Sequence, residues 1–292
     1  MTLGTFDGVH LGHQKIIDRL LTSAAKNNLE SVVLTFSQHP RAVLHVDSNI
    51  KLLNSNEEKI ALLEKKGIDN LIIHPFDSQF SGLTGEEFVR TVLVGKLNIQ
   101  KIIIGYDHRF GKNRNSNIDD LIIYGKQYGF EVEQISAKEI NAVSISSTKI
   151  RNAITEGEIT LANKYLGYHY FITGTVTKGK QLGQTIGFPT ANLDIEEDSK
   201  LIPKNGVYVV KSTLNNVEVF GMMNVGTNPT VHGKGRSIEA HFFDFSDNLY
   251  SQKISVSFLK RLRSEQKFDS VLLLREQLQK DRAASQAFLD DL

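Results

Sequence analysis

Short apolar runs alternate with amphipathic segments along the first half of the chain. The runs at 31–36, 70–76 and 101–106 are rich in β-branched residues and bounded by turn residues, as buried strands are. Helices are predicted to begin between them at Ser55 and Thr84, because each hydroxyl is followed three positions later by a glutamate that can complete a capping box. This alternation predicts a parallel sheet with right-handed crossovers, so the first half is expected to be α/β.

The pattern changes after about residue 168, where strand-like segments follow one another without a long helix. Glycine, asparagine and proline fill the connections between them, which favours an antiparallel sheet or a small barrel. The predicted strands lie within residues 170–183, 206–214, 217–226, 238–245 and 253–263. A helical pattern returns over 269–292. The expected fold is α/β and then mainly β, with a parallel sheet in residues 1–167 and a small antiparallel β-barrel with terminal helices in residues 168–292.

Composition narrows the classes of function. With 40% hydrophobic and 23% charged residues, the chain has the make-up of a globular protein. The formal net charge is +1 at pH 7, which offers no basic footprint for nonspecific nucleic-acid binding, so any polyanion must be held locally. Cysteine is absent, which excludes a disulfide framework and a thiolate zinc site and fits a reducing compartment.

The chain also lacks the signals of membrane insertion and secretion. There is no run of about 18 apolar residues, and the N-terminus has no basic region followed by an apolar core. We therefore expect no membrane partner, a cytoplasmic location, and a monomer or a weakly self-associating chain.

The segment GTFDGVHLGH, residues 4–13, lies at the end of the first predicted strand and at the start of a helix. In an open α/β sheet, ligands bind beyond the carboxyl ends of the strands. Glycines let the backbone approach a phosphate closely, and a helix N-terminus offers N–H groups and partial positive charge. His10 and His13 would share one face of the helix and could donate hydrogen bonds to phosphoryl oxygens. A tight turn with two incidental histidines is the alternative.

Two further segments carry polar side chains beside predicted sheet edges. SISSTKIR, residues 144–151, gathers hydroxyls and cations at the apparent start of a helix, namely Ser146, Ser147, Thr148, Lys149 and Arg151. GYDHRFGKNR, residues 105–114, forms a glycine-bearing loop after a strand and exposes Asp107, Arg109 and Arg114. The first arrangement suits a triphosphate. Taken alone, each segment has a simpler interpretation, as a serine-capped helix and as a solvated loop.

The segment GKQLGQTIGFPTANL, residues 179–193, combines a flexible loop with an extended stretch. Four residues shape the loop and its closing turn, namely Gly179, Gly183, Gly187 and Pro189. Thr190 and Asn192 are two residues apart on the extended stretch, so their side chains would point to the same side. Hydroxyl and amide oxygens suit Mg²⁺, which also binds substrate phosphates. A polar pair at a strand edge is the alternative.

The segment RSIEAHFFDF, residues 236–245, is predicted to be a strand in which Glu239 and His241 face one side. A carboxylate that faces a bound hydroxyl could act as a general base in phosphoryl transfer. A surface glutamate in a strand is the alternative. NVGTNPT, residues 224–230, adds a tight turn that by itself is an ordinary connection.

Together these strings resemble a known family. HxGH with the later ISSTKIR is similar to the nucleotidyltransferase superfamily, and the longer string G-x-F-D-G-V-H-x-G-H resembles the FMN adenylyltransferase domain of prokaryotic bifunctional riboflavin kinase/FAD synthetases. GxxxGFPTAN, N-x-G-x-x-P-T and R-x-x-E-x-H follow in that order and resemble riboflavin kinase. The resemblance covers nearly the whole chain. It implies a Rossmann-like nucleotidyltransferase domain in residues 1–167 and a riboflavin kinase-like barrel in residues 168–292.

The resemblance implies two activities, the ATP-dependent phosphorylation of riboflavin to FMN and the adenylylation of FMN to FAD with release of pyrophosphate. ATP would be the co-substrate, Mg²⁺ the metal, and the flavins riboflavin, FMN and FAD the substrates and products. His10 and His13 would act at the α-phosphoryl centre, and Glu239 would be the catalytic base. Thr190 and Asn192 would hold Mg²⁺-ATP.

Further residues are implied as ligands of the nucleotide or the flavin. In the first domain these are Gly4, Phe6, Asp7, Gly8, Gly12, Asp107, Arg109, Ser147, Thr148 and Arg151. The last three of that set would hold the β,γ end of ATP, and the loop with Asp107 would help to seat nucleotide and flavin. In the second domain the implied residues are Gly179, Gly183, Gly187, Pro189, Asn224 and Arg236.

The chain departs from the family's pattern at three places. Only Met1-Thr2-Leu3 precede Gly4, where family members carry a further segment, so a first strand that is short for a central position is expected. The family's F-D-P-H-P stands here as FSQHP, residues 36–40, and the phenylalanine of its GYDFRFG loop is His108. The last two changes bear on how the flavin is seated.

The motifs disfavour two rival functions. A different adenylyl- or cytidylyltransferase with an unrelated β-module would leave GFPTAN and RSIEAH as coincidences. A degenerate flavin sensor or an RNA-binding protein would be expected to have lost some of the five principal side chains, whereas all of them are present, namely His10, His13, Thr190, Asn192 and Glu239. RNA binding is further disfavoured by the near-neutral charge.

Overall fold

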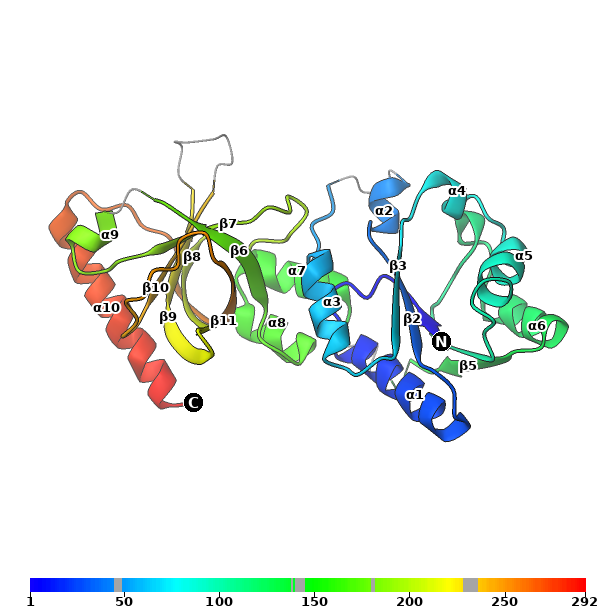
Figure 1. The fold of residues 1–292 in the computed structure, drawn as a ribbon. Helices are drawn as coiled ribbons and strands as arrows, with labels where there is room; N and C mark the ends of the chain where they lie inside the picture. The colour runs from blue at the N-terminus through cyan, green and yellow to red at the C-terminus, as the bar shows by residue number, and fades with distance from the viewer. Residues whose placement is uncertain (45–48, 138, 140–144, 180–181, 228–235) are drawn as a thin grey trace. The chain divides into compact units, whose positions relative to one another are not determined.

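The computed structural model describes residues 1–44, 49–137, 139, 145–179, 182–227 and 236–292 (Figure 1). The chain divides into two compact units, Met1–Ser147 and Thr148–Leu292. The functional boundary that the sequence predicts, between residues 167 and 168, stays a prediction. In the described part of the chain, no helix has the length and apolar content needed to cross a membrane.

The first unit contains a parallel sheet with a very short central strand. Strand β1 (Thr2–Leu3) pairs with β2 (Val32–Phe36), and β2 pairs with β3 (Asn70–His74). Strand β4 (Lys101–Gly105) pairs with β5 (Glu131–Ile135). The amino group of Met1 donates to the carbonyl of Lys101, and the carbonyl of Met1 accepts the N–H of Ile103. These bonds place β1 beside β4, which gives the order β3-β2-β1-β4-β5. The predicted parallel α/β sheet is confirmed.

Helices connect these strands and begin where the sequence predicts. The helical segments of the first unit are α1 (Leu11–Asn27), α2 (Pro40–Val43), α3 (Asn56–Glu64), α4 (Ser78–Ser81), α5 (Gly85–Glu87), the π-helix η1 (Phe88–Val94), the 3₁₀ turn η2 (Lys112–Arg114) and α6 (Ile118–Tyr128). Both predicted capping boxes are present, Ser55 with Glu58 and Thr84 with Glu87. In each, the hydroxyl accepts the N–H of the glutamate and the glutamate accepts the N–H of the cap.

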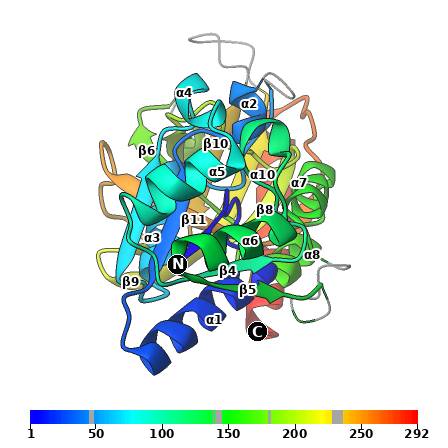
Figure 2. The same ribbon diagram turned by 90° about the vertical axis from the view of Figure 1, so that its right-hand side faces the viewer.

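Both faces of the sheet are covered, as the apolar strands require. Ile102 and Ile104 of β4 pack in one cluster with Leu93 of η1, whereas Ile103 packs in the other with Ile17 of α1. Alternate residues of a strand point to opposite faces, so a strand covered on both sides reads as a continuous apolar run. Figure 2 shows β4 and β5 between α1 and α6.

The second unit is a closed barrel with helices. It contains the helices α7 (Ser147–Glu156, whose first residue belongs to the first unit), α8 (Ile159–Leu166), α9 (Leu182–Thr185) and α10 (Val271–Asp290). The barrel strands are β6 (Phe171–Thr177), β7 (Ala191–Asp194), β8 (Gly206–Leu214), β9 (Val217–Gly226), β10 (Ser237–Phe242) and β11 (Lys253–Arg263). They close in the order β10-β7-β6-β11-β8-β9 with antiparallel neighbours, which confirms the predicted barrel.

Helix α10 packs along one side of the barrel, against β9 and β11 (Figure 1). Leu274 and Leu278 of this helix pack against a cluster that includes Phe188 and Met222. A bidentate ion pair adds to this contact, because Arg263 of β11 donates from Nε to Oδ1 of Asp281 at 2.9 Å and from Nη2 to Oδ2 at 2.7 Å. Asp281 is almost fully buried, so this pair is part of the interior.

Candidate functional site

The segment that carries the two histidines of the first unit has an unusual backbone. Phe6 and Val9 adopt positive φ angles of 48° and 34°, and Gly8 lies between them at 85°. A β-branched residue such as valine rarely adopts this conformation, and the strain is of order 1–3 kcal/mol for each such residue. Phe6 and Val9 are both 2% exposed and pack into the core, so burial of their side chains offsets this strain.

Hydrogen bonds hold this loop from several sides. Oδ1 of Asp7 accepts the N–H of Leu53 at 2.9 Å and that of Asn54 at 3.4 Å. The carbonyl oxygen of Asp7 accepts the hydroxyl of Ser147 at 2.9 Å. Thr35 donates to the carbonyl of Thr5 as well. The structure therefore brings Ser147 to the histidine loop, and it turns the carboxylate of Asp7 toward neighbouring backbone.

His10 and His13 stand together at the N-terminus of α1. His10 caps the helix, because its Nδ1 accepts the N–H of His13 at 3.3 Å. The two imidazoles stack with centroids 3.7 Å apart and planes 17° apart. Burial, and then the neighbouring His10, lowers the pKa of His13 well below 6.5. Nδ1 of His13 is buried and has no hydrogen-bond partner among the described residues.

This arrangement suits an anion. Nδ1 of His10 acts as an acceptor, so the proton of its neutral ring is on Nε2, from which it can be donated. The first turn of α1 contains no acidic residue, which leaves the positive end of the helix uncompensated there. Gly12 is buried within α1. Gly4 leaves room for the ring of Phe6, because a Cβ on Gly4 would lie only 3.3 Å from a carbon of that ring.

The loop after β4 turns His108 inward and its charged neighbours outward. Asp107 and Arg109 are exposed, and so is Arg114. The imidazole of His108 stacks on Phe110 at 6.2 Å with an angle of 19°, and its Nε2 is buried without a hydrogen-bond partner among the described residues. Burial lowers the pKa of His108 to about 4, and the nearby Asp107 opposes that shift.

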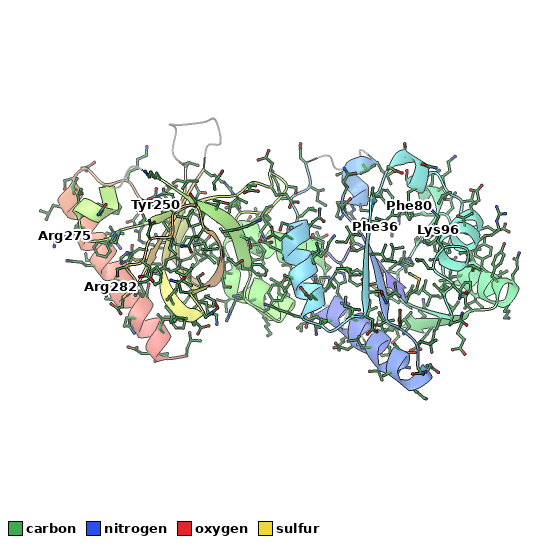
Figure 3. The ribbon with its side chains drawn as sticks, viewed as in Figure 1. Phe36, Phe80, Lys96, Tyr250, Arg275 and Arg282 are labelled. Atoms are coloured by element: carbon green, nitrogen blue, oxygen red, sulfur yellow. The ribbon has the colours of Figure 1, made fainter. Side chains whose placement is uncertain are left out.

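Aromatic rings continue from this loop toward the carboxyl end of β2. Phe110 contacts Phe88, Phe88 contacts Phe80, and the ring centroids of Phe80 and Phe36 are 5.5 Å apart. Phe36 and Phe80 are labelled in Figure 3. Phe36 begins the FSQHP string, so two of the departures from the family's pattern lie at the two ends of one aromatic row.

The ISSTKIR string is described from residue 145 onward, and Ser144 lies outside the described residues. Helix α7 begins at Ser147, as expected. Thr148 and Lys149 are exposed and Arg151 is half-buried. These three residues belong to the second unit, whereas Ser147 belongs to the first.

The predicted kinase residues meet where β7 and β10 pair. Asn192 of β7 lies directly opposite Glu239 of β10, and Asn224 of β9 lies opposite Glu239 on its other side. The hydroxyl of Thr190 donates to Oε2 of Glu239 at 3.3 Å. Four polar side chains from three strands and one turn are therefore neighbours, although they are spread over 50 residues of sequence.

The loop glycines fit closely around this cluster. A Cβ on Gly179 would lie 2.3 Å from Nδ2 of Asn192, and a Cβ on Gly183 would lie 2.2 Å from the carbonyl oxygen of Phe188. Gly187 has a φ of +85°, which favours glycine, and Pro189 follows it. Lys180 and Gln181 of the same string lie outside the described residues.

A cavity of about 220 Å³ opens beside the cluster. Its polar wall includes Thr190, Asn224 and Glu239, together with His241 and Glu265. Its apolar wall is formed by Ile186, Phe188, Val207, Met222, Met223, Phe268, Leu274 and Leu278. A cavity that is apolar with a few converging polar groups is the usual form of a small-molecule site.

Two predicted ligand segments lie less directly at this cavity. Arg236 is exposed and donates to the carbonyl of Ile202 at 3.2 Å. In the NVGTNPT string, Asn224 is described and adjoins Glu239, whereas residues 228–230 lie outside the described residues.

The metal-binding potential of the second unit comes from oxygen ligands. Across the described ranges, no group of three or more histidine, aspartate, glutamate or cysteine residues could hold a metal ion. Thr190 and Asn192 instead offer a hydroxyl and an amide oxygen beside Glu239. Mg²⁺ prefers such hard oxygens and keeps several positions for water and phosphate, so these residues fit it.

Sequence reasoning missed part of the cavity. Met222 and Leu274 carry no chemical signature, so only their packing reveals them. The sequence did point to His241 as a member of the cavity, because its spacing from Glu239 places both side chains on one face of the predicted strand. Its pKa is lowered by burial, and the carbonyl of Pro189, which accepts from its ring, opposes that shift.

Comparisons with known proteins match both units. The FAD synthetase family model matches residues 1–149, and the riboflavin kinase family model matches residues 166–289.

Curated relatives match over the full length. A protein of Buchnera aphidicola is 40% identical over 96% of this chain and 91% of its own length, and one of Listeria monocytogenes is 40% identical over 100% of this chain and 93% of its own. A protein of Escherichia coli is 34% identical over 99% of this chain and 92% of its own length. All three are named bifunctional riboflavin kinase/FMN adenylyltransferase.

A solved structure has the same fold. A crystal structure from Streptococcus pneumoniae superposes with a TM-score of 0.87 at 34% identity, covering 98% of this chain and 93% of that one. That protein is named a macrolide-efflux protein, which differs from the enzymatic names of the curated relatives.

Proposed function

The chain belongs to the family of bifunctional riboflavin kinase/FMN adenylyltransferases, and we propose that the two residue clusters described above are its two active sites. The protein phosphorylates riboflavin to FMN with ATP. It also transfers the adenylyl group of ATP to FMN, which forms FAD and releases pyrophosphate. The cluster around Glu239 is assigned to the first step and the cluster around His10 to the second.

In the kinase step, Glu239 is the general base. It accepts the proton of the primary hydroxyl of riboflavin while that oxygen bonds to the γ-phosphorus of ATP and ADP leaves. The hydrogen bond between Thr190 and Glu239 supports this role, since it fixes the carboxylate beside the residues assigned to the nucleotide.

Mg²⁺ is assigned to Thr190 and Asn192 in the same site. When bound, the ion would neutralise charge on the phosphates of ATP. The close fit of Gly179 against the amide of Asn192 supports this assignment, because a side chain at 179 would displace that amide. Gly183 and Gly187 complete the nucleotide loop, and Asn224 lines the same cavity.

In the adenylyltransferase step, a phosphate oxygen of FMN bonds to the α-phosphorus of ATP and the bond to pyrophosphate breaks. His10 and His13 are assigned to the α-phosphoryl group, where donated hydrogen bonds stabilise the charge that develops. Their stacking at the N-terminus of α1 supports this role. The loop of Gly4, Phe6, Gly8 and Gly12 is assigned to the phosphates and is held rigid by its contacts.

The remaining residues are assigned by resemblance to the family. Ser147, Thr148 and Arg151 would hold the β,γ end of ATP, and Ser147 is supported by its bond to the histidine loop. Asp107 and Arg109 would help to seat the nucleotide and the flavin, in keeping with their exposure in the loop after β4.

The observation that carries the proposal is the meeting of Thr190, Asn192 and Glu239 at one point of the barrel. The test incubates the purified chain with riboflavin, ATP and Mg²⁺ and separates riboflavin, FMN and FAD over time. The wild-type chain is expected to form FMN and then FAD. His10→Ala is expected to accumulate FMN, and Glu239→Gln is expected to form none.

Each variant is a control for the other. Glu239→Gln must still convert added FMN to FAD, because its first unit is unchanged. If both variants lose the same step, the assignment of the two clusters is wrong.

The extent of each domain, the oligomeric state and the location belong to the same proposal. A boundary at residues 167 and 168 is supported by the start of β6 at Phe171 and of the riboflavin kinase match at residue 166. A location in the cytoplasm is supported by the need of both steps for ATP, whereas the monomeric or weakly self-associating state stays a prediction from the sequence. Light scattering of the purified chain and fractionation of cells test these two points.

A further inference from the structure

His241 has one buried ring nitrogen that forms no hydrogen bond with the described residues. The residue is 7% exposed and lines the cavity beside Glu239. Its Nε2 is buried and has no hydrogen-bond partner among the described residues. Most buried polar atoms in folded proteins have a partner, and leaving one without a partner costs roughly 1–3 kcal/mol. An unsatisfied atom beside a substrate cavity is therefore a candidate ligand contact.

The other ring nitrogen defines which tautomer is present. Nδ1 lies 2.8 Å from the carbonyl oxygen of Pro189, and a carbonyl can only accept, so Nδ1 is the donor. In the neutral ring, Nε2 then carries a lone pair and can accept a hydrogen bond.

Two phenylalanine rings keep the imidazole in this orientation. Phe188 and Phe243 contact it edge to face, with centroids 5.2 Å and 5.9 Å away. Arg282 of α10 in turn covers Phe243, with its guanidinium carbon 5.5 Å from the ring centroid, and is labelled in Figure 3. The ring is thus held by aromatic packing and by Pro189, while Nε2 has no hydrogen-bond partner in the part of the chain that the structure describes.

The distance along β10 indicates which part of the substrate His241 would meet. Glu239 and His241 are two residues apart and face the same side of the strand, which separates their Cα atoms by about 7 Å. Glu239 is assigned to the primary hydroxyl at the end of the ribityl chain of riboflavin. His241 lies one step further along the strand, so the group that it would meet is a secondary hydroxyl of the ribityl chain.

We propose that His241 is a specificity-determining residue, whose Nε2 accepts a hydrogen bond from a secondary ribityl hydroxyl of riboflavin. The proposal rests on the assignment of the kinase site to the Glu239 cluster. A hydroxyl can donate to the lone pair of Nε2 and can rotate to suit it. The bond would form only when riboflavin is bound, and it would satisfy the unpaired atom at that moment.

Met222 is a flexible neighbour of His241 in the cavity. It lies directly opposite His241 on β9 and lines the same cavity. Methionine is unbranched and flexible, so its side chain can adjust at little cost when a substrate enters.

The test compares two substrates in three proteins. The substrates are riboflavin and a flavin whose N10 chain is 5-hydroxypentyl, which keeps the primary hydroxyl and lacks all secondary ones. The proteins are the wild-type chain, His241→Asn and His241→Gln. The amide nitrogen of asparagine can replace Nδ1 at Pro189 but offers nothing at Nε2, whereas the amide of glutamine reaches the position of Nε2.

For riboflavin, His241→Asn is expected to lower kcat/KM roughly tenfold, mainly through KM, as the loss of one hydrogen bond predicts. For the hydroxypentyl flavin, kcat/KM of His241→Asn is expected to stay within about twofold of the wild-type value. This substrate lacks the hydroxyl that His241 would bind, and about twofold is the usual deviation when two changes do not interact. His241→Gln is expected to recover part of the loss with riboflavin.

Other outcomes overturn the inference. An equal loss with both substrates would show that His241 is structural, and no loss with riboflavin would show that it makes no contact. If His241→Asn fails to fold, as judged by its melting curve and its conversion of FMN to FAD, His241→Gln decides alone, because an equal loss with both substrates would again reject the contact. A wild-type chain that phosphorylates neither flavin would refute the proposed kinase site instead.

Discussion

Three histidines of this protein carry buried ring nitrogens at or near the proposed ligand-binding sites. His13, His108 and His241 each have a ring nitrogen that is buried without a partner among the described residues. Burial is the largest cause that lowers the pKa of all three. A buried neutral imidazole is costly to the free protein and available to a ligand. The two assigned sites and the flavin-seating loop thus share one physical feature.

The pKa of His108 predicts a pH dependence of stability. In the unfolded chain its pKa is near 6.5, and in the folded protein it is about 4. Below pH 6.5 the unfolded chain therefore binds a proton that the folded protein does not. Above pH 6.5 the titration of His108 does not lower the free energy of unfolding. As the pH drops from 6.5 toward 4, the free energy of unfolding falls by up to about 1.4 kcal/mol per pH unit.

His108→Phe removes this titration and keeps an aromatic ring beside Phe110. Urea unfolding of both proteins at pH 7 and pH 5 measures the effect, and the wild-type chain is expected to lose more stability than the variant between these values. The other buried histidines titrate in both proteins, so the difference isolates His108. Equal losses would mean that the ring of His108 is solvated.

At the scale of elements, α10 shapes the cavity that we assign to the kinase step without belonging to the barrel. It contributes Leu274 and Leu278 to the apolar wall, and it is tied to β11 by the ion pair between Asp281 and Arg263. Gln277 also donates to Asp281 at 2.9 Å. Removing one partner of such a buried pair leaves an uncompensated charge, which costs more than the pair itself contributes.

Asp281→Ala is therefore expected to lower the free energy of unfolding by about 3 kcal/mol, because Arg263 is left unpaired against the helix. The matched control is Glu218→Gln, which breaks the exposed pair with Lys211 at 2.8 Å and is expected to cost less than about 1 kcal/mol. Chemical denaturation measures both variants. Similar losses in the two would show that the pair at α10 is solvated rather than buried.

At the scale of the whole molecule, the contacts described within each cluster lie in one unit, although Thr148 and Arg151, which are assigned to ATP in the second step by resemblance, belong to the second unit. The kinase cluster lies within Thr148–Leu292, and the histidine loop with its anchors lies within Met1–Ser147. FMN is the product of one site and the substrate of the other, and it is a small diffusible molecule. The two sites can therefore be carried by different copies of the chain.

A mixture of His10→Ala and Glu239→Gln chains is expected to convert riboflavin to FAD, although neither variant does so alone. The first makes FMN and the second adenylylates it. Chromatography of the flavins, with each variant alone as control, measures the outcome. A mixture that makes FMN but no FAD, while Glu239→Gln still converts added FMN, would show that FMN is not released from the kinase site.

The sequence by itself determined the local features of both units. Capping boxes at Ser55 and Thr84 were predictable because their signals span only four residues. Apolar runs predicted β2, β3 and β4, because this signal also lies within a few consecutive residues. The predicted strand at 238–245 is shorter in the structure, since β10 ends at Phe242, and β5 and the short β7 were not predicted as strands. The motif strings also indicated which side chains to assign to the chemistry, because each string is contiguous, and those roles stay predictions.

Only the tertiary structure decided which of these segments meet. The pairing of Asn192 with Glu239 depends on the register of β7 and β10, which are separated in sequence by β8 and β9. Asp7, expected at a ligand, has its carboxylate on the backbone of Leu53 and Asn54. The unsatisfied nitrogen of His241 likewise follows from packing with Pro189 and the neighbouring rings. Long-range packing sets these contacts, and short sequence patterns carry no information about it.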